Sequence, residues 1–278
     1  MQWLANRFQI DLRQPRLMGI VNCTPDSFSD GGQFADTRSA LRHCEQLLRE
    51  GADILDVGAE SSRPGAQPLP LADELARLAP IVTAALTLGV PISIDTYKPA
   101  VMQAMLDLGV DIINDIWALR QPQAVQTLAR YPQCGVVLMH MHGEPQTMQA
   151  APLQGAVVPA VHGFFVARLA ALADPAWAGR VCLDPGIGFG KTVEQNCALT
   201  ANLAAFQDLG LPLLMGWSRK SSLGAITGLP VGERLAPSVA AALISVQNGA
   251  NILRVHDVAA TRAALQVAQA CNTLPSGM

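Results

Sequence analysis

Short apolar runs alternate along the chain with longer segments of helical periodicity. The runs are rich in Val, Ile and Leu and are not interrupted by alternating polar residues. Strands buried on both faces have this composition, as in a parallel sheet covered by helices. The predicted strands are residues 16–22, 52–58, 90–95, 110–115, 135–140, 180–184, 211–216 and 251–256. The predicted helices are residues 37–50, 71–88, 98–108, 122–130, 153–173, 193–206, 231–247 and 258–271.

Eight strand–helix units in 278 residues predict an α/β fold, a single (β/α)8 TIM barrel, which typically takes about 250 residues. No linker or change of composition divides the chain, so we expect one domain over residues 1–278. A doubly wound open sheet is the alternative architecture. The segment before Arg16, which contains "RFQIDL", predicts a short N-terminal hairpin outside the eightfold pattern.

Composition narrows the class of protein. Half of the residues are hydrophobic and 15% are charged, which favours a large core over disorder. A net charge of -3 without long Lys/Arg runs argues against nucleic-acid binding. We expect no membrane span and no signal peptide, because no apolar stretch is long enough and the N-terminus lacks the signal pattern. Six scattered cysteines without a Cys-x-x-Cys motif predict reduced thiols in a cytoplasmic protein.

The predicted strands end in chemically active residues. In a TIM barrel, catalytic groups lie at the C-terminal ends of the strands and in the loops beyond them. The residues at these ends are Asn22, Asp56, Asp95, Asn114, Asp115, His140, Asp184, the pair Arg219–Lys220, Arg254 and His256. Any one Asp or Asn among them is also explained as a helix cap or turn residue. Their concentration at one rim of the barrel predicts a functional site.

Two segments near the C-terminus indicate a site for an anion. In "GWSRKSSLG", residues 216–224, Arg219 and Lys220 stand between hydroxyl residues in front of a short predicted helix. Arg254 and His256 follow at the end of the eighth strand. The loops after the seventh and eighth strands of a barrel are a frequent phosphate site. We therefore predict a pocket for phosphate or pyrophosphate.

Two further loops carry candidate chemistry. Arg63 stands between Ser62 and Pro64, in a proline-stiffened loop that can present a planar fork to phosphate or carboxylate. The loop "DPGIGFGK", residues 184–191, contains glycines that would let the backbone approach a ligand closely. It does not match the Walker pattern, and a tight turn before a helix explains it equally well.

Three polar residues of the rim are not basic. Asp95, Asn114 and Asp184 place two carboxylates and one amide deep in the predicted barrel. Buried acceptors of this kind suit a flat heterocycle with several N–H donors, and they reject analogues that lack those donors. The sequence therefore predicts two adjoining sub-sites, one for a heterocycle and one for a phosphate group.

Seven segments resemble, in order, the motifs of the bacterial dihydropteroate synthase family. They are "MGIVNCTPDSFSDGG", "ILDVGAESSRPGA", "SIDTYKP", "DIINDI", "LDPGIGFGK", "GWSRKS" and "LRVHDV", between Arg16 and Thr261. The resemblance implies a transferase of folate biosynthesis, which condenses 6-hydroxymethyl-7,8-dihydropterin diphosphate with 4-aminobenzoate to give 7,8-dihydropteroate and pyrophosphate. It also implies dependence on Mg²⁺, a homodimer, and competitive inhibition by sulfonamides. No insertion follows Pro64 of the kind found in sulfonamide-insensitive relatives, so we expect sensitivity.

The resemblance also implies roles for individual residues. The pterin would be bound by Asp95, Asn114, Asp184, Lys220 and Arg254. The diphosphate would be bound by Asn22, Arg63, Arg254 and His256, with Asn22 as a ligand of Mg²⁺. The aminobenzoate would contact Phe28, Ser62, Pro64, Phe189, Lys220 and Ser221.

By the same resemblance, the reaction is dissociative. The bond to diphosphate breaks first, Arg63 and Lys220 assist, and Asp30 stabilises the pterin cation while the loop of residues 23–32 closes over it. Asp30 is otherwise explained as a turn residue before two glycines. Two alternatives share the pterin-binding acids: a methyltetrahydrofolate methyltransferase and a paralogue that binds pterins without catalysis. The spacing of His140 and His142 suggests either a metal site or, in our preferred interpretation, a polar loop rim.

Overall fold

Parallel strands form the centre of the protein in a computed structural model that describes residues 1–23, 32–60 and 65–274, without the side chains of 32–36. In these residues the eight strands are β3 (Arg16–Asn22), β4 (Ile54–Gly58), β5 (Ile92–Asp95), β6 (Ile112–Asp115), β7 (Gly135–Met139), β8 (Val181–Asp184), β9 (Leu214–Met215) and β10 (Ile252–Val255). Their order is β8-β7-β6-β5-β4-β3-β10-β9. A parallel bridge between Leu183 and Leu213 joins the two edges, so the sheet is a nearly closed barrel. The predicted TIM barrel is confirmed, and the open-sheet alternative is wrong.

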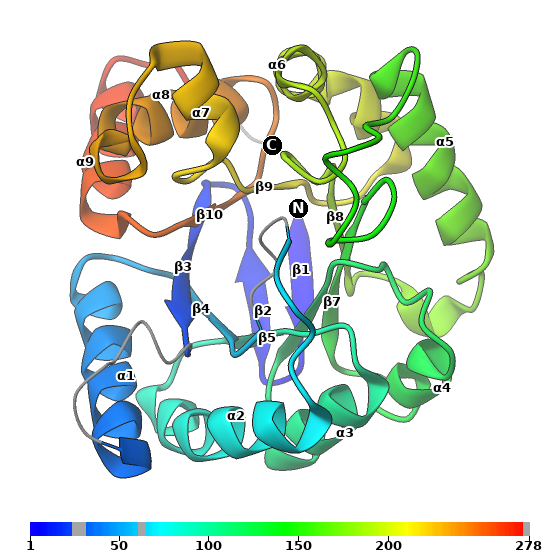
Figure 1. The fold of residues 1–278 in the computed structure, drawn as a ribbon, viewed down its shortest axis with the longest axis vertical. Helices are drawn as coiled ribbons and strands as arrows, with labels where there is room; N and C mark the ends of the chain where they lie inside the picture. The colour runs from blue at the N-terminus through cyan, green and yellow to red at the C-terminus, as the bar shows by residue number, and fades with distance from the viewer. Residues whose placement is uncertain (24–31, 61–64, 275–278) are drawn as a thin grey trace.

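Helices surround the strands, as Figure 1 shows. They are α1 (Gly32–Arg49), α2 (Leu71–Ala85), α3 (Pro99–Leu108), α4 (Ala124–Ala129), α5 (Val157–Ala170), α6 (Val193–Ala201), α7 (Ser221–Thr227), α8 (Leu235–Gln247) and α9 (Val258–Ala270). The local sequence sets several ends: α3 begins at Pro99 and stops at Gly109, whose φ of 100° only glycine adopts readily. None of the helices in the described residues is long and apolar enough to cross a membrane.

The predicted elements differ from the observed ones mainly at their ends. The predicted strand 211–216 shortens to two residues, Leu214 and Met215, and the predicted helix 153–173 to Val157–Ala170. The predicted helix 193–206 ends at Ala201 because the chain tightens into a 3₁₀ helix over Leu203–Leu209. Such tightening at helix ends is common, and periodicity does not reveal it.

The predicted N-terminal hairpin is present, and it closes one end of the barrel. Strands β1 (Gln2–Ala5) and β2 (Phe8–Asp11) pair antiparallel, and Figure 1 shows them across the centre of the ring of strands. Trp3 is fully buried, and its indole Nε1 donates a hydrogen bond to the carbonyl of Arg180 at 2.8 Å. The hairpin packs on one apolar residue from each of seven strands: Met18, Ile54, Ile112, Val137, Cys182, Leu214 and Ile252.

The inner face of the barrel changes chemistry along each strand. Side chains alternate between the two faces of a strand, so residues two apart share a face. Two residues beyond Ile54 and Ile112 of the apolar layer stand Asp56 and Asn114, and two residues beyond Ile252 stands Arg254. The outward-facing residues pack instead with the helices in the main hydrophobic core. The lumen is therefore apolar at the end with the hairpin and polar at the C-terminal ends of the strands.

Candidate active site

Arg254 crosses the lumen and joins three strands at its polar end. Its Nε donates to Oδ2 of Asp56 at 2.6 Å, and its Nη2 donates to Oδ2 of Asp95 at 2.7 Å. Asn114, which pairs with Asp95 in the β5–β6 register, donates through Nδ2 to the same oxygen of Asp56 at 3.2 Å. Burial alone would lower the pKa of Arg254, but the two carboxylates raise it above its usual value. The guanidinium therefore stays charged and fixed in position.

Burial shifts the pKa values of three other ionisable residues of the lumen, Asp95, Asp184 and Lys220. Burial raises the pKa of Asp95 to about 7, against the opposing charge of Arg254. Burial also raises the pKa of Asp184, whose Oδ1 accepts a hydrogen bond from the backbone N–H of Gly186 at 2.7 Å. Burial lowers the pKa of Lys220 to about 8, although Asp184 opposes this shift. Clusters of perturbed acids and bases in a cleft are typical of functional sites.

Lys220 reaches this cluster, whereas its neighbour Arg219 does not. The Nζ of Lys220 donates to the carbonyl of Ile187 and lies 4.9 Å from the centre of the Phe189 ring. Arg219 has a left-handed backbone, with φ of 59°, and forms an ion pair with Asp257 at 2.5 Å. The prediction that both cations face the anion pocket is therefore wrong for Arg219.

His256 is held by a hydroxyl group from the neighbouring loop. The Oγ of Ser218 lies 3.0 Å from Nδ1 of His256 and accepts a hydrogen bond from its backbone N–H at 3.1 Å. Because that oxygen already accepts from the backbone, its own proton can be directed at Nδ1. The other ring nitrogen, Nε2, would then carry a proton, as a donor to an anion requires.

Two glycines of the loop of residues 184–191 pack against protein backbone. Gly186 and Gly190 have φ values of 72° and 66°, and a Cβ on them would lie 1.9 Å from the carbonyl oxygen of His140 and 2.1 Å from that of His142. Lys191 is buried, and its Nζ donates to the carbonyl of His140 at 3.2 Å and to two carbonyls of its own loop. These two glycines therefore serve the close approach to the end of β7, which corrects our ligand interpretation.

The sequence predicts His140 in a polar loop rim, but the structure buries it. The residue is 5% exposed, and its ring lies edge-on to Phe164 with centres 4.9 Å apart. Burial lowers its pKa to about 2, so the ring is neutral. Within the described residues there is no group of three His, Cys, Asp or Glu residues that could hold a metal ion.

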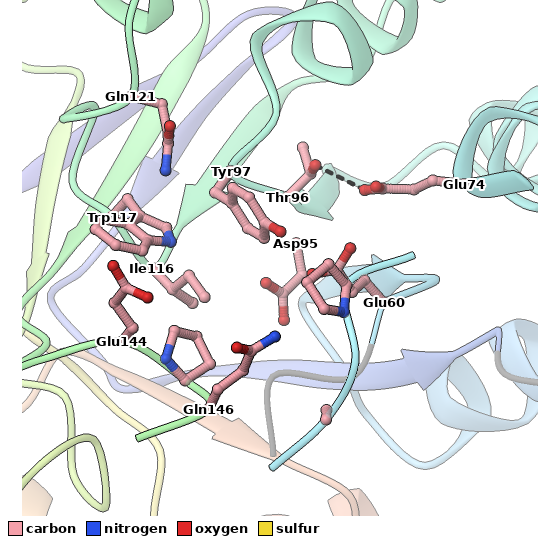
Figure 2. A pocket seen from close by; sticks show the side chains of 13 residues that line it. Glu60, Glu74, Asp95, Thr96, Tyr97, Ile116, Trp117, Gln121, Glu144 and Gln146 are labelled. Carbon is pink, nitrogen blue, oxygen red and sulfur yellow. Dashed lines mark hydrogen bonds between the residues drawn. The ribbon is translucent and has the colours of Figure 1, made fainter. Parts of the chain in front are cut away.

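A pocket of about 280 Å³ opens beside Asp95 (Figure 2). Tyr97, Ile116 and Trp117 form its apolar walls, and Figure 2 shows Asp95 between Tyr97 and Glu60. The pocket therefore connects the lumen cluster with the protein surface.

A clamp on one side of this pocket joins the two ends of the β4–α2 loop. The Nζ of Lys98 forms ion pairs with Glu60 at 2.5 Å and with Glu74 at 2.6 Å, and donates to the carbonyl of Leu69. The same carboxylate of Glu60 accepts from the backbone N–H of Leu69 at 2.8 Å. Glu60 and Leu69 are thus joined to each other beside Asp95.

The predicted aminobenzoate and loop residues are only partly described. Phe28, Asp30, Ser62, Arg63 and Pro64 lie outside the described residues. Phe189 is 9% exposed and packs with Ile116, Met139, Met141 and Met148. Ser221 is the first residue of α7 and lines a second pocket, of about 360 Å³, together with Lys191 and Thr192. Asn22, the predicted metal ligand, is the last residue of β3 and is partly buried.

Sequence reasoning assigned no role to two residues of the site. Asp56 is fully buried and binds Arg254, although the two residues are 198 positions apart in the chain. The available signal was a carboxylate inside an otherwise apolar strand, "ILDVG". Ser218 holds His256, and its only signal was a hydroxyl residue next to the Arg–Lys pair.

A parallel barrel with buried acids, an amide and two cations at the C-terminal ends of its strands is the arrangement of an enzyme that binds a polar heterocycle. The family model described as pterin binding enzyme matches residues 18–256, and the chain belongs to this family. Dihydropteroate synthases are among its relatives within the family. That of Neisseria meningitidis serogroup B is 49% identical over 275 residues, which cover 96% of each chain.

Two solved structures are similar throughout. The dihydropteroate synthase of Burkholderia cenocepacia, complexed with 7,8-dihydropteroate, has a TM-score of 0.89 at 50% identity, over 98% of this chain and 96% of that one. That of Yersinia pestis, in a sulfonamide drug complex, has a TM-score of 0.91 at 39% identity, over 98% of this chain and 100% of that one. The family resemblance predicted from the motifs is confirmed.

Proposed function

We propose that this chain is a dihydropteroate synthase, a transferase that joins 6-hydroxymethyl-7,8-dihydropterin diphosphate to 4-aminobenzoate and releases pyrophosphate. The observation that carries the proposal is the polar layer of the lumen, where Asp95, Asn114 and Asp184 face Lys220 and Arg254. The relatives favour this reaction over methyl transfer from a tetrahydrofolate and over binding without catalysis, because they are synthases and one holds the product.

The pterin is recognised by complementary hydrogen-bonding edges. Asp184 and Asn114 offer oxygen acceptors to the N–H donors of its amino-pyrimidine edge, and Lys220 donates to its acceptor side. Arg254, held by Asp56 and Asp95, lies against the ring face. Unpaired buried groups would be costly, so a ring without matching donors is rejected.

The diphosphate lies toward Asn22, Arg63, Arg254 and His256. Asn22, at the end of β3, would supply one amide oxygen to Mg²⁺. A single amide ligand from the protein fits an ion that would be bound mainly through the diphosphate, because Mg²⁺ prefers oxygen ligands. Bound Mg²⁺ would neutralise charge on the leaving pyrophosphate.

The chemistry follows from that charge distribution. Arg63, Arg254 and His256 stabilise the departing pyrophosphate, and Asp30 stabilises the pterin cation that remains at the methylene carbon. The amine of 4-aminobenzoate attacks this cation without needing a strong base. Its carboxylate lies near Ser221, and its ring contacts Phe189 and the stem of Lys220. Phe28, Ser62 and Pro64 complete the aminobenzoate site.

Three further properties belong to this proposal. Sulfonamides inhibit competitively with 4-aminobenzoate, in line with the drug complex of the Yersinia pestis synthase. Two copies associate through helices α8 and α9, where Ile244 is 48% exposed and Val267 65% exposed. The protein works in the reducing cytoplasm, because its six cysteines are unpaired thiols.

The test is turnover with purified protein. We would mix the protein with Mg²⁺, the pterin diphosphate and labelled 4-aminobenzoate, and follow labelled dihydropteroate and pyrophosphate. We expect product with the wild type and with Arg13→Met, a matched change of an exposed cation far from the polar end of the lumen. Lys220→Met should abolish product. A wild type that binds the pterin but forms no dihydropteroate would contradict the proposal.

A further inference from the structure

Asp56 is a buried residue that binds two of the five proposed pterin contacts, Arg254 and Asn114, and it is not itself one of them. It lies inside β4, its side chain is fully buried, and it does not line the pocket beside Asp95. Two hydrogen bonds converge on one of its oxygens, Oδ2: from Nε of Arg254 at 2.6 Å and from Nδ2 of Asn114 at 3.2 Å. The donors come from β10 and β6, so a single atom couples strands on opposite sides of β4.

The first consequence concerns the guanidinium of Arg254. Its Nε and Nη2 form the edge that usually binds a carboxylate with two parallel bonds. Here that edge is divided between Asp56 and Asp95 on neighbouring strands. The division fixes the plane of the group across the lumen and leaves the Nη1 edge and a flat face for a ligand. With Asp95 alone, Arg254 could rotate and pair with it through both nitrogens.

The second consequence concerns the amide of Asn114. Because its Nδ2 donates to Asp56, its Oδ1 is turned away from that carboxylate as an acceptor. An amide rotated by half a turn would bring two oxygens together and present a donor to the ligand instead. The carboxylate of Asp56 therefore determines which hydrogen-bonding pattern the amide presents.

The other oxygen of Asp56, Oδ1, makes no competing hydrogen bond within the described residues. This atom is buried and has no hydrogen-bond partner within the described residues. The neighbouring Ser93, which is opposite Asp56 in the β4–β5 register, also has a buried hydroxyl without a partner there. In the described residues the buried charge of Asp56 is thus balanced by Arg254 at Oδ2, where Asn114 adds a hydrogen bond; both are proposed pterin contacts.

We propose that Asp56 is a positioning residue for heterocycle recognition, which locks the guanidinium plane of Arg254 and the amide orientation of Asn114 before the ligand arrives. It does not touch the substrate. The inference rests on the proposed function for the identity of the heterocycle, a pterin with N–H donors along one edge. Pre-organised contacts of this kind lower the cost of binding, since the groups lose no further freedom.

The test compares Asp56→Asn with a matched control, Asp111→Asn. Asp111 is also fully buried and also binds an arginine, Arg7 at 2.8 Å, but at the opposite end of the strands. We would measure binding of the pterin diphosphate with Mg²⁺ by calorimetry, without 4-aminobenzoate. Asp56→Asn should raise Kd by about 10- to 100-fold, because a charged partner of two buried donors is lost. Asp111→Asn should leave Kd unchanged while it lowers stability.

Two further readouts separate positioning from general damage to the fold. The charge of Asp56 raises the pKa of Asp95, so Asp56→Asn should move the acidic limb of kcat/KM to lower pH. In an Arg254→Met background, Asp56→Asn should change Kd by less than about threefold, because most of its effect passes through Arg254. If Asp56→Asn does not fold, Asp56→Ser replaces it, with the same expected changes.

The outcomes distinguish this inference from the function on which it rests. A Kd for Asp56→Asn within twofold of the wild type would overturn the positioning role, as would an undiminished loss in the Arg254→Met background. A wild type that binds the pterin but forms no dihydropteroate would overturn the proposed reaction alone, since Kd still reports on Asp56. A wild type that binds no pterin would overturn both.

Discussion

The two ends of the barrel lumen are built by the same strands and have opposite chemistry. At the hairpin end, Trp3 packs on a layer of apolar residues. Two residues further along three of these strands, the layer consists of Asp56, Asn114 and Arg254. Burial of the apolar layer away from water stabilises the folded protein. The polar layer holds buried charges, which destabilise it unless they are paired. The residues that stabilise the fold and the residues of the proposed site are therefore only two positions apart along the same strands.

The largest expected effect lies at the polar end. Asp184→Asn retains an oxygen that can accept from the N–H of Gly186 but removes the charge that faces Lys220. We expect kcat/KM to fall by roughly 1000-fold, because the amide can no longer accept from all donors of the pterin edge. Steady-state kinetics would measure this, with urea unfolding as a control. A fall below tenfold would show that Asp184 does not contact the reacting pterin.

A mutation at the hairpin end should lower stability but leave catalysis unchanged. Trp3→Ala removes a fully buried ring and its hydrogen bond to Arg180. We expect the free energy of unfolding to fall by about 3–5 kcal/mol, as for other aromatic-to-alanine changes in cores. In the fraction that stays folded, kcat/KM should remain within about twofold of the wild type, because the sites are distant. A large loss of kcat/KM without a loss of stability would contradict the separation of the two ends.

A change of pH should have an intermediate effect on kcat/KM. The pKa of Asp95 is about 7 and that of Lys220 about 8, both shifted by burial. Protonation of Asp95 below pH 7 weakens its hold on Arg254, and deprotonation of Lys220 above pH 8 removes a charge. The profile of kcat/KM should therefore be bell-shaped, falling by about tenfold per pH unit on each side. Lys220→Arg should remove the basic limb, because a guanidinium stays charged; an unchanged basic limb would assign it to another group.

The smallest effect is expected at Arg219, next to Lys220. Its partner is Asp257 rather than the lumen, and its side chain is 46% exposed. Arg219→Ala should change the free energy of unfolding by less than about 1 kcal/mol, as is usual for exposed ion pairs. The KM for the pterin diphosphate should stay the same. An increase in that KM would return Arg219 to the anion site that its position in the sequence suggested.

The fold could be predicted from the sequence because both faces of each strand are buried. Runs such as "RLMGIVN" then consist almost entirely of apolar residues, and β3 spans the predicted residues 16–22. The prediction for the short strand β9 was too long because the apolar run begins at Leu211, before the strand starts at Leu214. The residues at the strand ends could be predicted for the same reason, since Asp95, Asn114 and Asp184 each interrupt or end an apolar run.

The pairings between these residues could not be predicted. Asp56 and Arg254 are neighbours only because the barrel brings β4 and β10 to either side of β3. The glycines at 186 and 190 looked like a ligand loop, and only the position of β7 shows what they approach. His140 looked like a surface residue because its burial depends on Phe164, 24 residues away. The hydrophobic pattern of the sequence shows where a residue lies within a strand or helix. Contacts between strands and helices depend on how the barrel closes.

The most direct test of the account is a crystal structure of the protein with bound 7,8-dihydropteroate. We expect the pterin ring to lie at the polar end of the lumen, with its amino-pyrimidine edge on Asp184 and Asn114 and its face against Arg254. The guanidinium should still form its ion pairs with Asp56 and Asp95. A pterin ring bound elsewhere, or an Arg254 that has left Asp56 to receive it, would contradict the account.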